Sequence, residues 1–174
     1  MNLHLLSFAT TIEDIGFQDT ELRQLRLHES ASRYCRCHHI AWKRKQVLKT
    51  DFAKNNAAVF SEPKGAGYWL WKPYIIHEAL VRMAEGDYLI YADNAYYFIK
   101  SPQLLLPYVD PATGLGMFMD AGYRLKNIIH DEAIRRLGLQ GSDLLDCPIV
   151  MAQLMVIRKT SFALRLVEEW LELC

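Results

Sequence analysis

Residues 65–98 read GAGYWLWKPYIIHEALVRMAEGDYLIYADNAYYF and predict, in order, an aromatic loop, a helix, a tight turn and a buried strand. Pro73 suits the first turn of a helix, where its missing N–H is no loss. Gly86 is the expected end of that helix, because glycine accepts the left-handed backbone that helix ends often need. The apolar residues between them recur at helical spacing and predict one face packed on a core: Ile76, Ala79, Leu80 and Met83.

The strand after this helix ends on a charge. Tyr88–Ala92 is nearly all apolar, as expected of a strand that is covered on both faces, and Asp93 follows it. In open α/β sheets, ligands bind just beyond the carboxyl ends of the strands. Position alone therefore makes Asp93 a site candidate, and the alternative is that its side chain only caps a turn.

Composition indicates one soluble globular domain. The 174 residues are enough for a single core and are predicted to form one domain, 1–174, with 51% apolar and 23% charged residues. Twenty basic and twenty acidic residues balance, which gives no overall field for nucleic acid. No apolar run reaches the length of a membrane span, and the start lacks the positive region of a signal peptide. Four cysteines without a framework favour a reducing compartment, so the predicted location is cytoplasmic.

The alternation of apolar strands with amphipathic helices predicts an α/β fold with a mostly parallel central sheet and helices on both faces. The predicted strands are Leu3–Phe8, His38–Trp42, Tyr88–Ala92, Leu115–Met119 and Met151–Arg158, with Tyr96–Ile99 as a further candidate. The predicted helices cover residues 20–33, 47–60, 73–85, 131–137 and 163–174, and residues 10–19 are expected to form a polar turn.

The last helix has the clearest apolar stripe and is predicted to pack Leu166, Val167 and Trp170 on the sheet. A substitution Trp170→Ala would then cost about 3–5 kcal/mol. The helix reaches the last residue without a cap, so either the natural chain continues or this form is truncated at its C-terminus.

Several polar and aromatic side chains near the central stretch are candidates for ligand binding. Lys72 begins a helix, where anions such as a diphosphate are favoured, although a solvated surface lysine is the alternative. Tyr68 and Trp71, with Trp69 between them, could stack on a nucleobase or a sugar. The alternative is that they fill the core, and we expect mostly core with one ring reaching the ligand. Gln153 lies in an apolar strand, where a buried amide needs backbone or substrate partners.

Two other clusters are weighed against simpler interpretations. Asp131 and Glu132 begin a short helix, so Asp131 is either an N-cap or part of a catalytic or acceptor-binding pair. The group at residues 35–39, CRCHH, resembles a metal cluster. Its spacing matches no common zinc pattern, and alternate strand residues face opposite sides, so ordinary strand residues are the prediction.

GAGYWLWKPYII followed by GDYLIYADNA resembles a group of bacterial, largely uncharacterised glycosyltransferases of the A-type, or nucleotide-diphospho-sugar transferase, fold. Members of that group typically carry GYWLWKP and then a strand of the form YLD followed by small residues. The similarity extends more loosely to SFAT near the start and to AQLMVIRKT and FALRLVEEWLELC near the end. The resemblance implies a Rossmann-like domain that transfers a sugar from a nucleotide-diphosphate donor to a glycan or lipid-linked acceptor, in polysaccharide, lipopolysaccharide or capsule synthesis, in the cytoplasm or at the inner membrane surface.

In A-type enzymes the acid after the strand usually belongs to a D-x-D motif that holds a divalent cation on the donor diphosphate. The matching positions here are Asp93, Asn94 and Ala95, so the second acid is absent. Manganese or magnesium prefers several oxygen ligands. Asp93 is thus a candidate metal ligand, with the donor ribose as its alternative partner. The donor-binding candidates are Asp93, Asn94, Lys72, Trp71, Tyr68 and Gln153, and the catalytic candidates are Asp131 and Glu132. The competing hypothesis is an inactive nucleotide-sugar or carbohydrate-binding domain of the same fold.

Overall fold

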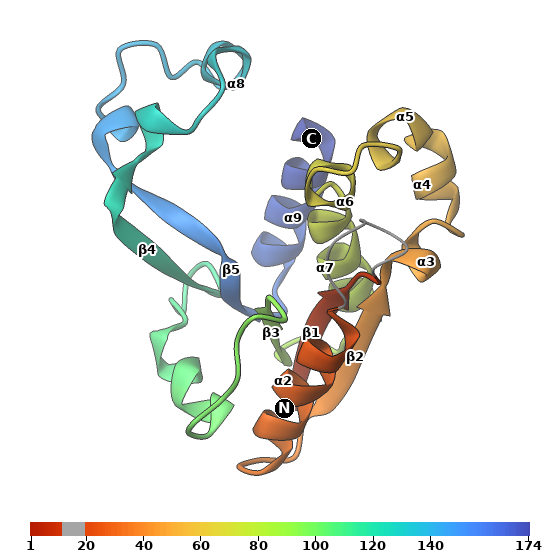
Figure 1. Ribbon diagram of the computed structural model, residues 1–174. Helices are drawn as coiled ribbons and strands as arrows, with labels where there is room; N and C mark the ends of the chain where they lie inside the picture. The colour runs from red at the N-terminus through yellow and green to blue at the C-terminus, as the bar shows by residue number, and fades with distance from the viewer. Residues whose placement is uncertain (12–19) are drawn as a thin grey trace.

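The computed structural model describes residues 1–11 and 20–174 and has a five-stranded sheet at its centre, in the order β2-β1-β3-β5-β4 (Figure 1). The strands are β1 (Leu3–Ala9), β2 (His38–Lys43), β3 (Tyr88–Ala92), β4 (Leu115–Arg124) and β5 (Pro148–Arg158). All five predicted strands are therefore confirmed, the last two being longer than expected. The further candidate Tyr96–Ile99 is irregular instead. The predicted turn at residues 10–19 falls mostly outside the described residues.

The sheet is mixed rather than mostly parallel. β1 pairs in parallel with both β2 and β3, whereas β5 is antiparallel to β3 and to β4. A parallel pair needs a crossover that passes over the sheet, whereas an antiparallel pair needs only a return. The chain between β4 and β5 returns at the end where β4 stops (Figure 1). The prediction of parallel strands thus holds for β1, β2 and β3 and is wrong for the β4–β5 edge.

Helices cover both faces of the sheet, as predicted. On one face lie α7 (Trp71–Arg82) and α9 (Ser161–Leu173), and on the other lie α2 (Glu21–Ser32) and the 3₁₀ helix η1 (Pro102–Tyr108). The sheet residues in the α7–α9 core are Leu6, Phe8, Leu89, Tyr91, Met155 and Ile157. Those in the α2–η1 core are Leu3, Leu5, Ile90, Ala92 and Val156. The strand β3 is thus buried on both faces, which confirms its assignment from the apolar run.

The remaining helices are short. The predicted helix over residues 47–60 is wrong in its continuity, because Thr50 has an extended backbone and its hydroxyl accepts a hydrogen bond from Ala53 N at 3.2 Å, which begins a new helix. The chain there forms α3 (Arg44–Val47), α4 (Asp51–Asn55) and α5 (Ala57–Phe60). The other short helices are α6 (Gly65–Tyr68), η2 (Leu125–Asn127), α8 (Asp131–Arg136) and η3 (Asp143–Asp146).

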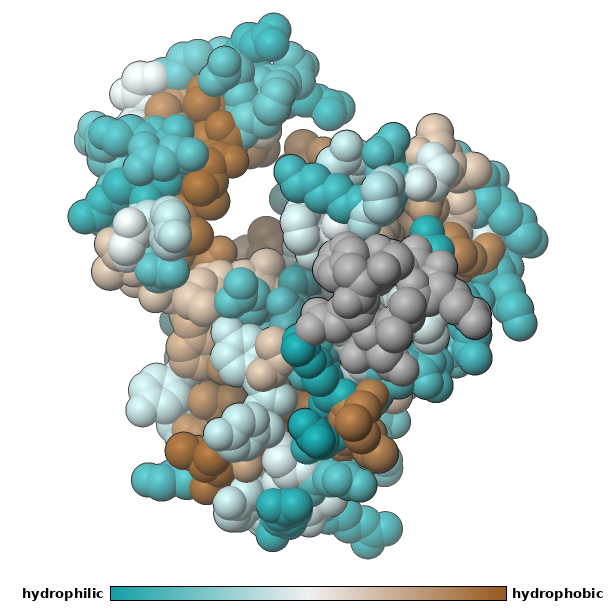
Figure 2. All heavy atoms as spheres, viewed as in Figure 1, coloured by the Kyte–Doolittle hydropathy of each residue, from teal (hydrophilic) through white to brown (hydrophobic). Residues whose placement is uncertain are grey.

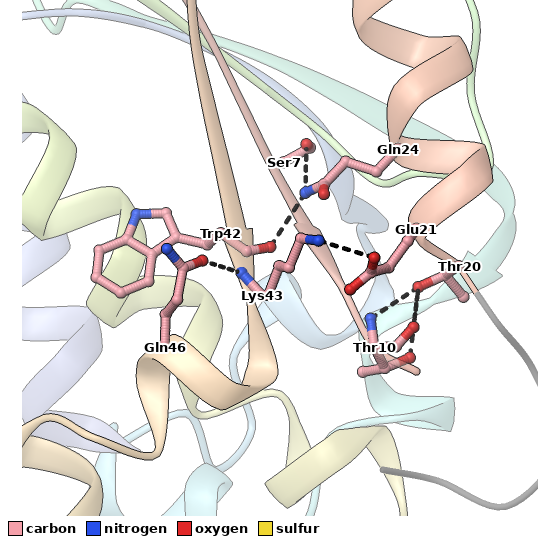
Figure 3. Close-up of polar contacts among 8 residues, drawn as sticks. All are labelled: Ser7, Thr10, Thr20, Glu21, Gln24, Trp42, Lys43 and Gln46. Atoms are coloured by element: carbon pink, nitrogen blue, oxygen red, sulfur yellow. Dashed lines mark hydrogen bonds and ion pairs between the residues drawn. The ribbon is translucent and has the colours of Figure 1, made fainter. Parts of the chain in front are cut away.

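Polar side chains fasten α2 to the two neighbouring strands β1 and β2 (Figure 3). The Gln24 side-chain amide donates to Ser7 Oγ and to the Trp42 carbonyl, both at 3.0 Å. Lys43, at the end of β2, forms an ion pair with Glu21 at 2.7 Å. These bonds fix the beginning of α2 at the carboxyl ends of β1 and β2. Asp93 lies at the same end of these parallel strands.

A pair of histidines, of which His28 is buried and His39 is exposed, continues this polar contact. His28 Nε2 lies 2.6 Å from Ser7 Oγ, and His28 Nδ1 lies 2.5 Å from His39 Nδ1. Ser32 Oγ donates to the His28 carbonyl and therefore accepts from His39 Nε2, at 3.0 Å. His28 Nδ1 then donates to His39 and Ser7 donates to His28, so one consistent set of protons leaves both rings neutral. Burial, followed by the neighbouring charge of His39, lowers the pKa of His28 to about 4.

We expect acid to destabilise the protein through His28. The unfolded chain takes up this proton near pH 6.5, but the native state does so only near pH 4, so stability present above about pH 6.5 is lost as the pH falls between these values. The loss is about 2–3 kcal/mol. Urea unfolding at pH 7 and pH 4 should show a weaker pH dependence for His28→Gln than for the wild type. The control His77→Gln, at a partly buried histidine on α7, should retain the wild-type dependence, and an unchanged dependence in His28→Gln would contradict this prediction.

The last helix is rotated relative to the predicted packing. α9 packs mainly against α7, with Ala163 and Val167 buried, whereas Leu166 is exposed and Trp170 is only partly buried. The prediction is therefore confirmed for Val167 and in part for Trp170, which is partly buried against the core between α9 and the sheet, and it is wrong for Leu166. The estimate of 3–5 kcal/mol for Trp170→Ala is too high, because it applies to a fully buried ring.

Val167→Ala is accordingly expected to lower the free energy of unfolding by about 2 kcal/mol, since it removes two buried methyl groups and leaves a cavity. Leu166→Ala, one residue away on the exposed side, should cost less than about 1 kcal/mol. Urea denaturation of both variants measures the difference. A larger loss in Leu166→Ala would mean that the helix packs through the other face.

Candidate functional site

Asp93 lies just beyond the carboxyl end of β3, beside the end of the parallel strand β1. Its Oδ1 accepts hydrogen bonds from Lys72 Nζ at 3.1 Å and from the Tyr91 hydroxyl, and its backbone N–H donates to the Gln153 carbonyl at 2.8 Å. The side chain is 31% exposed, and Oδ2 has no partner among the described residues. An ionised carboxylate only accepts hydrogen bonds, so Oδ2 is suited to a ligand hydroxyl.

Lys72 is buried beside Asp93 instead of being a surface lysine, which rules out the alternative drawn from the sequence. Its side chain is 7% exposed, and Nζ also donates to the Ala152 carbonyl at 2.9 Å. The ammonium lies over the Trp71 and Tyr91 rings, 5.6 and 5.0 Å from their centroids. Burial lowers the pKa of Lys72, and the charge of Asp93 opposes this effect. Burial, with the charge of Asp93 second, raises the pKa of Tyr91 well above its ordinary value.

An irregularity in β5 supplies the carbonyl that holds Lys72. Met117 pairs with Met155 but Phe118 pairs with Met151, so residues 152–154 have no partner in β4. The Ala152 carbonyl is therefore turned to Lys72. Gln153 is exposed, and its side-chain carbonyl accepts from the Tyr96 hydroxyl at 3.1 Å. The expectation of a buried Gln153 amide is wrong. It assumed a regular strand, in which side chains point alternately to the two faces of the sheet, and the bulge interrupts that alternation.

The aromatic loop before α7 is a left-handed turn. All five residues from Gly65 to Trp69 have positive φ, between 50° and 100°, including three that are not glycine. Left-handed backbone is costly for residues with a Cβ, and such strain collects at functional sites. The turn is held by Trp71, whose Nε1 donates to the Gly65 carbonyl at 2.9 Å and whose ring stacks on Phe8 with centroids 3.7 Å apart. As a result Trp71 is buried, while Trp69 is 49% exposed beside Asp93.

Two clefts meet at Asp93 and Trp69. The first cleft, of about 300 Å³, is lined by Phe8, Thr10, Pro63, Gly65, Ala66, Trp69, Trp71, Asp93, Asn94 and Ala95. The second cleft, of about 460 Å³, is lined by Trp69, Lys72, Asp93, Asp120, Tyr123, residues 149–153 and Trp170. Its far wall belongs to the projecting β4–β5 arm, and Figure 2 shows the hollow between this arm and the helical side of the molecule. The site therefore has a side formed by the ends of β1 and β3 and a side formed by the arm.

The structure brings most of the predicted donor residues together. Asp93, Asn94 and Trp71 line the first cleft, and Lys72 and Gln153 line the second. Asn94 is turned toward the end of β1, because its side-chain nitrogen donates to a main-chain carbonyl there at 2.7 Å. This bond joins the ends of the two parallel strands below the first cleft.

Three predicted residues lie outside these clefts. Tyr68 is exposed and lines neither cleft. Asp131 and Glu132 lie on α8, at the outer end of the arm (Figure 1), where Glu132 pairs with Arg135 at 2.6 Å. The helix is capped by the His130 side chain, which accepts from Glu132 N at 3.2 Å, so the alternative of Asp131 as N-cap is wrong. The structure therefore does not bring these two acids together with Asp93.

Trp69, one of the three rings that the sequence offered for stacking, lines both clefts, whereas sequence reasoning missed Asp120, Tyr123 and Trp170 as cleft residues. For Asp120 a signal was present, because it follows an apolar strand and precedes two small residues, as Asp93 does. The other two are aromatic residues in patterns that also fit a core. Tyr123 lies on β4 in the arm and Trp170 lies on α9, so the arrangement of these elements in space brings both rings to the wall of the second cleft.

The residues around Asp93 do not fit the divalent cation implied by the resemblance. Asp93 supplies one carboxylate, Asn94 could add at most one amide oxygen because its amide nitrogen donates to the main chain, and Ala95 has no ligand atom. Residues 1–11 and 20–174 contain no group of three or more acidic, histidine or cysteine side chains that could hold a metal ion, at Asp93 or at residues 35–39. Manganese and magnesium prefer several oxygen ligands.

Comparison with known proteins identifies the fold. No family model matches the sequence, and no curated protein sequence is similar to it. The crystal structure of mouse xyloside xylosyltransferase 1 in its apo form is similar, with a TM-score of 0.58 and 12% identity. The match covers 99% of this chain and 73% of that one. The chain thus shares the fold of a glycosyltransferase. Within the described part of the chain, no helix is long and apolar enough to cross a membrane.

Proposed function

We propose that the chain is a glycosyltransferase that binds a nucleotide-diphosphate sugar at Asp93 and transfers the sugar to a hydroxyl of a glycan or lipid-linked acceptor. The observation that carries the proposal is the position of Asp93, which lies at the carboxyl end of a buried strand and in the walls of both clefts. Two substrates could then meet at one carboxylate. The fold shared with a xylosyltransferase supports the same reaction class.

The first cleft suits the nucleoside part of the donor. It lies at the ends of β1 and β3, and its wall includes the half-exposed Trp69, on which a flat base or a sugar ring can stack. Asp93 Oδ2 can accept hydrogen bonds from the hydroxyls of the ribose or of the transferred sugar. The diphosphate then lies where the two clefts meet, close to Lys72.

The second cleft suits the acceptor. Trp69 and Trp170 offer aromatic surface for a sugar, and Gln153 offers an amide for its hydroxyls. Asp120 is the carboxylate in this cleft that can accept the proton of the attacking hydroxyl, a role for which Asp131 and Glu132 lie too far along the arm. The acceptor oxygen bonds to the anomeric carbon as the bond from that carbon to the diphosphate breaks, and the nucleoside diphosphate leaves. The protein's main contributions are orientation and charge.

Incubation with a panel of nucleotide-diphosphate sugars tests this function, with released nucleoside diphosphate measured by chromatography. Slow donor hydrolysis, or faster release when glycan acceptors are added, is the expected result. The same panel should be inert with Asp120→Asn and active with Asp143→Asn, a control on the exposed 3₁₀ helix η3. Binding without release would favour the inactive binding domain, and neither binding nor release would contradict both hypotheses.

A further inference from the structure

We propose that the Lys72 ammonium supplies the positive charge for the donor diphosphate, so that this site binds its nucleotide without a divalent metal ion. The inference rests on the proposed function, because it concerns how the same site holds the diphosphate. A nucleoside diphosphate carries several negative charges, and a site that binds it must provide opposite charge or many N–H donors.

The charged residues of the two clefts include one candidate for binding the negative diphosphate. Among the described residues that line them, the charged side chains are Lys72, Asp93 and Asp120, and Lys72 is the cation of the three. The two carboxylates would repel a diphosphate unless a cation lies between them and the phosphates. Among the described residues that line these two clefts, Lys72 is therefore the group that can offset the charge of the ligand.

The Lys72 ammonium already occupies the position beside Asp93 Oδ1 where a metal ion would bind. Lys72 Nζ lies 3.1 Å from Oδ1, the same oxygen that the Tyr91 hydroxyl also contacts. A metal ion bound to Oδ1 would lie beside a buried positive charge and would be repelled by it. The absence of a second acid at Ala95 removes the carboxylate that could offset this repulsion. The geometry thus disfavours a metal ion at Asp93, which is the position where the resemblance to A-type glycosyltransferases implies one.

The ammonium is also held ready for a ligand. An ammonium has three N–H donors, and the bonds to Asp93 and to the Ala152 carbonyl use two of them. The third donor is left for a phosphate oxygen. The Trp71 and Tyr91 rings and the first turn of α7 restrict the side chain, so little order is lost when the ligand binds.

Isothermal titration with UDP, GDP, ADP and dTDP, first in EDTA and then with manganese chloride, tests the inference. The wild type is expected to bind its preferred nucleotide with dissociation constants that agree within about twofold in the two buffers. Lys72→Met should weaken this binding at least about tenfold, because a charged hydrogen bond to phosphate is lost. Lys64→Met, an exposed lysine just before the turn, should bind as the wild type does.

The outcomes separate the two proposals. Nucleotide binding that requires manganese would overturn the inference and leave the glycosyltransferase proposal standing. Equal binding by Lys72→Met and the wild type in EDTA would also overturn it. If no nucleotide binds in either buffer, the proposed function fails and the inference fails with it. The comparison of the wild type in the two buffers decides the matter even if Lys72→Met does not fold.

Discussion

Asp93→Ala is expected to weaken binding of the preferred nucleotide sugar by roughly ten- to hundredfold. The substitution removes Oδ2, which has no partner among residues 1–11 and 20–174, together with the charge that pairs with Lys72. Loss of a hydrogen bond to a charged group accounts for the lower part of that range, and displacement of Lys72 accounts for the upper part. Isothermal titration of both proteins with the best donor measures the difference.

The fold should survive this substitution. Asp93 is about one-third exposed, and Lys72 keeps its bond to the Ala152 carbonyl, so the expected cost in stability is below about 2 kcal/mol. Asp51→Ala, which removes an exposed carboxylate that is paired with a lysine, is the matched control and should change neither affinity nor stability. Equal affinities in Asp93→Ala and the wild type would move the donor site elsewhere. A large loss of stability would instead make Asp93 a structural residue.

Gly67→Ala is expected to lower the free energy of unfolding by about 3 kcal/mol or more. Gly67 has φ of +100°, and a Cβ there would lie 3.1 Å from Phe60 Cα and 3.2 Å from the Val59 carbonyl oxygen. Both neighbours are backbone atoms of α5, so they cannot rotate away as a side chain would. The left-handed turn should open, and Trp69 should leave the clefts with it. Nucleotide affinity should therefore fall together with stability.

Gly86→Ala separates strain from crowding. Gly86 has φ of +83°, but a Cβ there would meet nothing within 4 Å. Only the cost of positive φ remains, about 1 kcal/mol, and nucleotide affinity should not change. Urea unfolding and titration of the two variants make the comparison. Similar losses of stability in Gly67→Ala and Gly86→Ala would show that α5 moves aside to accommodate the added Cβ. The turn would then not be held rigidly against α5.

The parts of the fold that follow from local pattern could be predicted from the sequence. The apolar run of β3 and the helical spacing that begins at Pro73 are consequences of which faces are buried. β3 lies where expected, whereas the helix, α7, begins at Trp71 and ends at Arg82, before the Gly86 that was expected to end it. Asp93 was predicted as a candidate site residue for the same reason, because its position is defined by the end of a buried strand. The direction of β5 could not be predicted, since antiparallel pairing depends on how the arm between β4 and β5 returns.

The details of the site depend on contacts between distant segments. From the sequence, Lys72 could be interpreted as a surface lysine because its partner, the Ala152 carbonyl, lies 80 residues away in the chain. That carbonyl is free to bind Lys72 only because the bulge in β5 interrupts pairing with β4. Trp69 lines the clefts and Tyr68 does not because the turn between residues 65 and 69 has positive φ at every residue. Residues other than glycine rarely have positive φ, so this turn could not be predicted from the local sequence. Asp120 enters the site only through the position of the arm.

A crystal structure of the wild-type protein grown with its preferred nucleotide sugar in EDTA tests the central claim most directly. The account predicts the nucleoside in the first cleft beside Trp69, the diphosphate within hydrogen-bond distance of Lys72 Nζ, and a ribose or sugar hydroxyl on Asp93 Oδ2. Nucleotide bound elsewhere, for example in the cleft beside α2 that is lined by Arg23, Arg26 and Arg33, with the clefts at Asp93 empty, would contradict it.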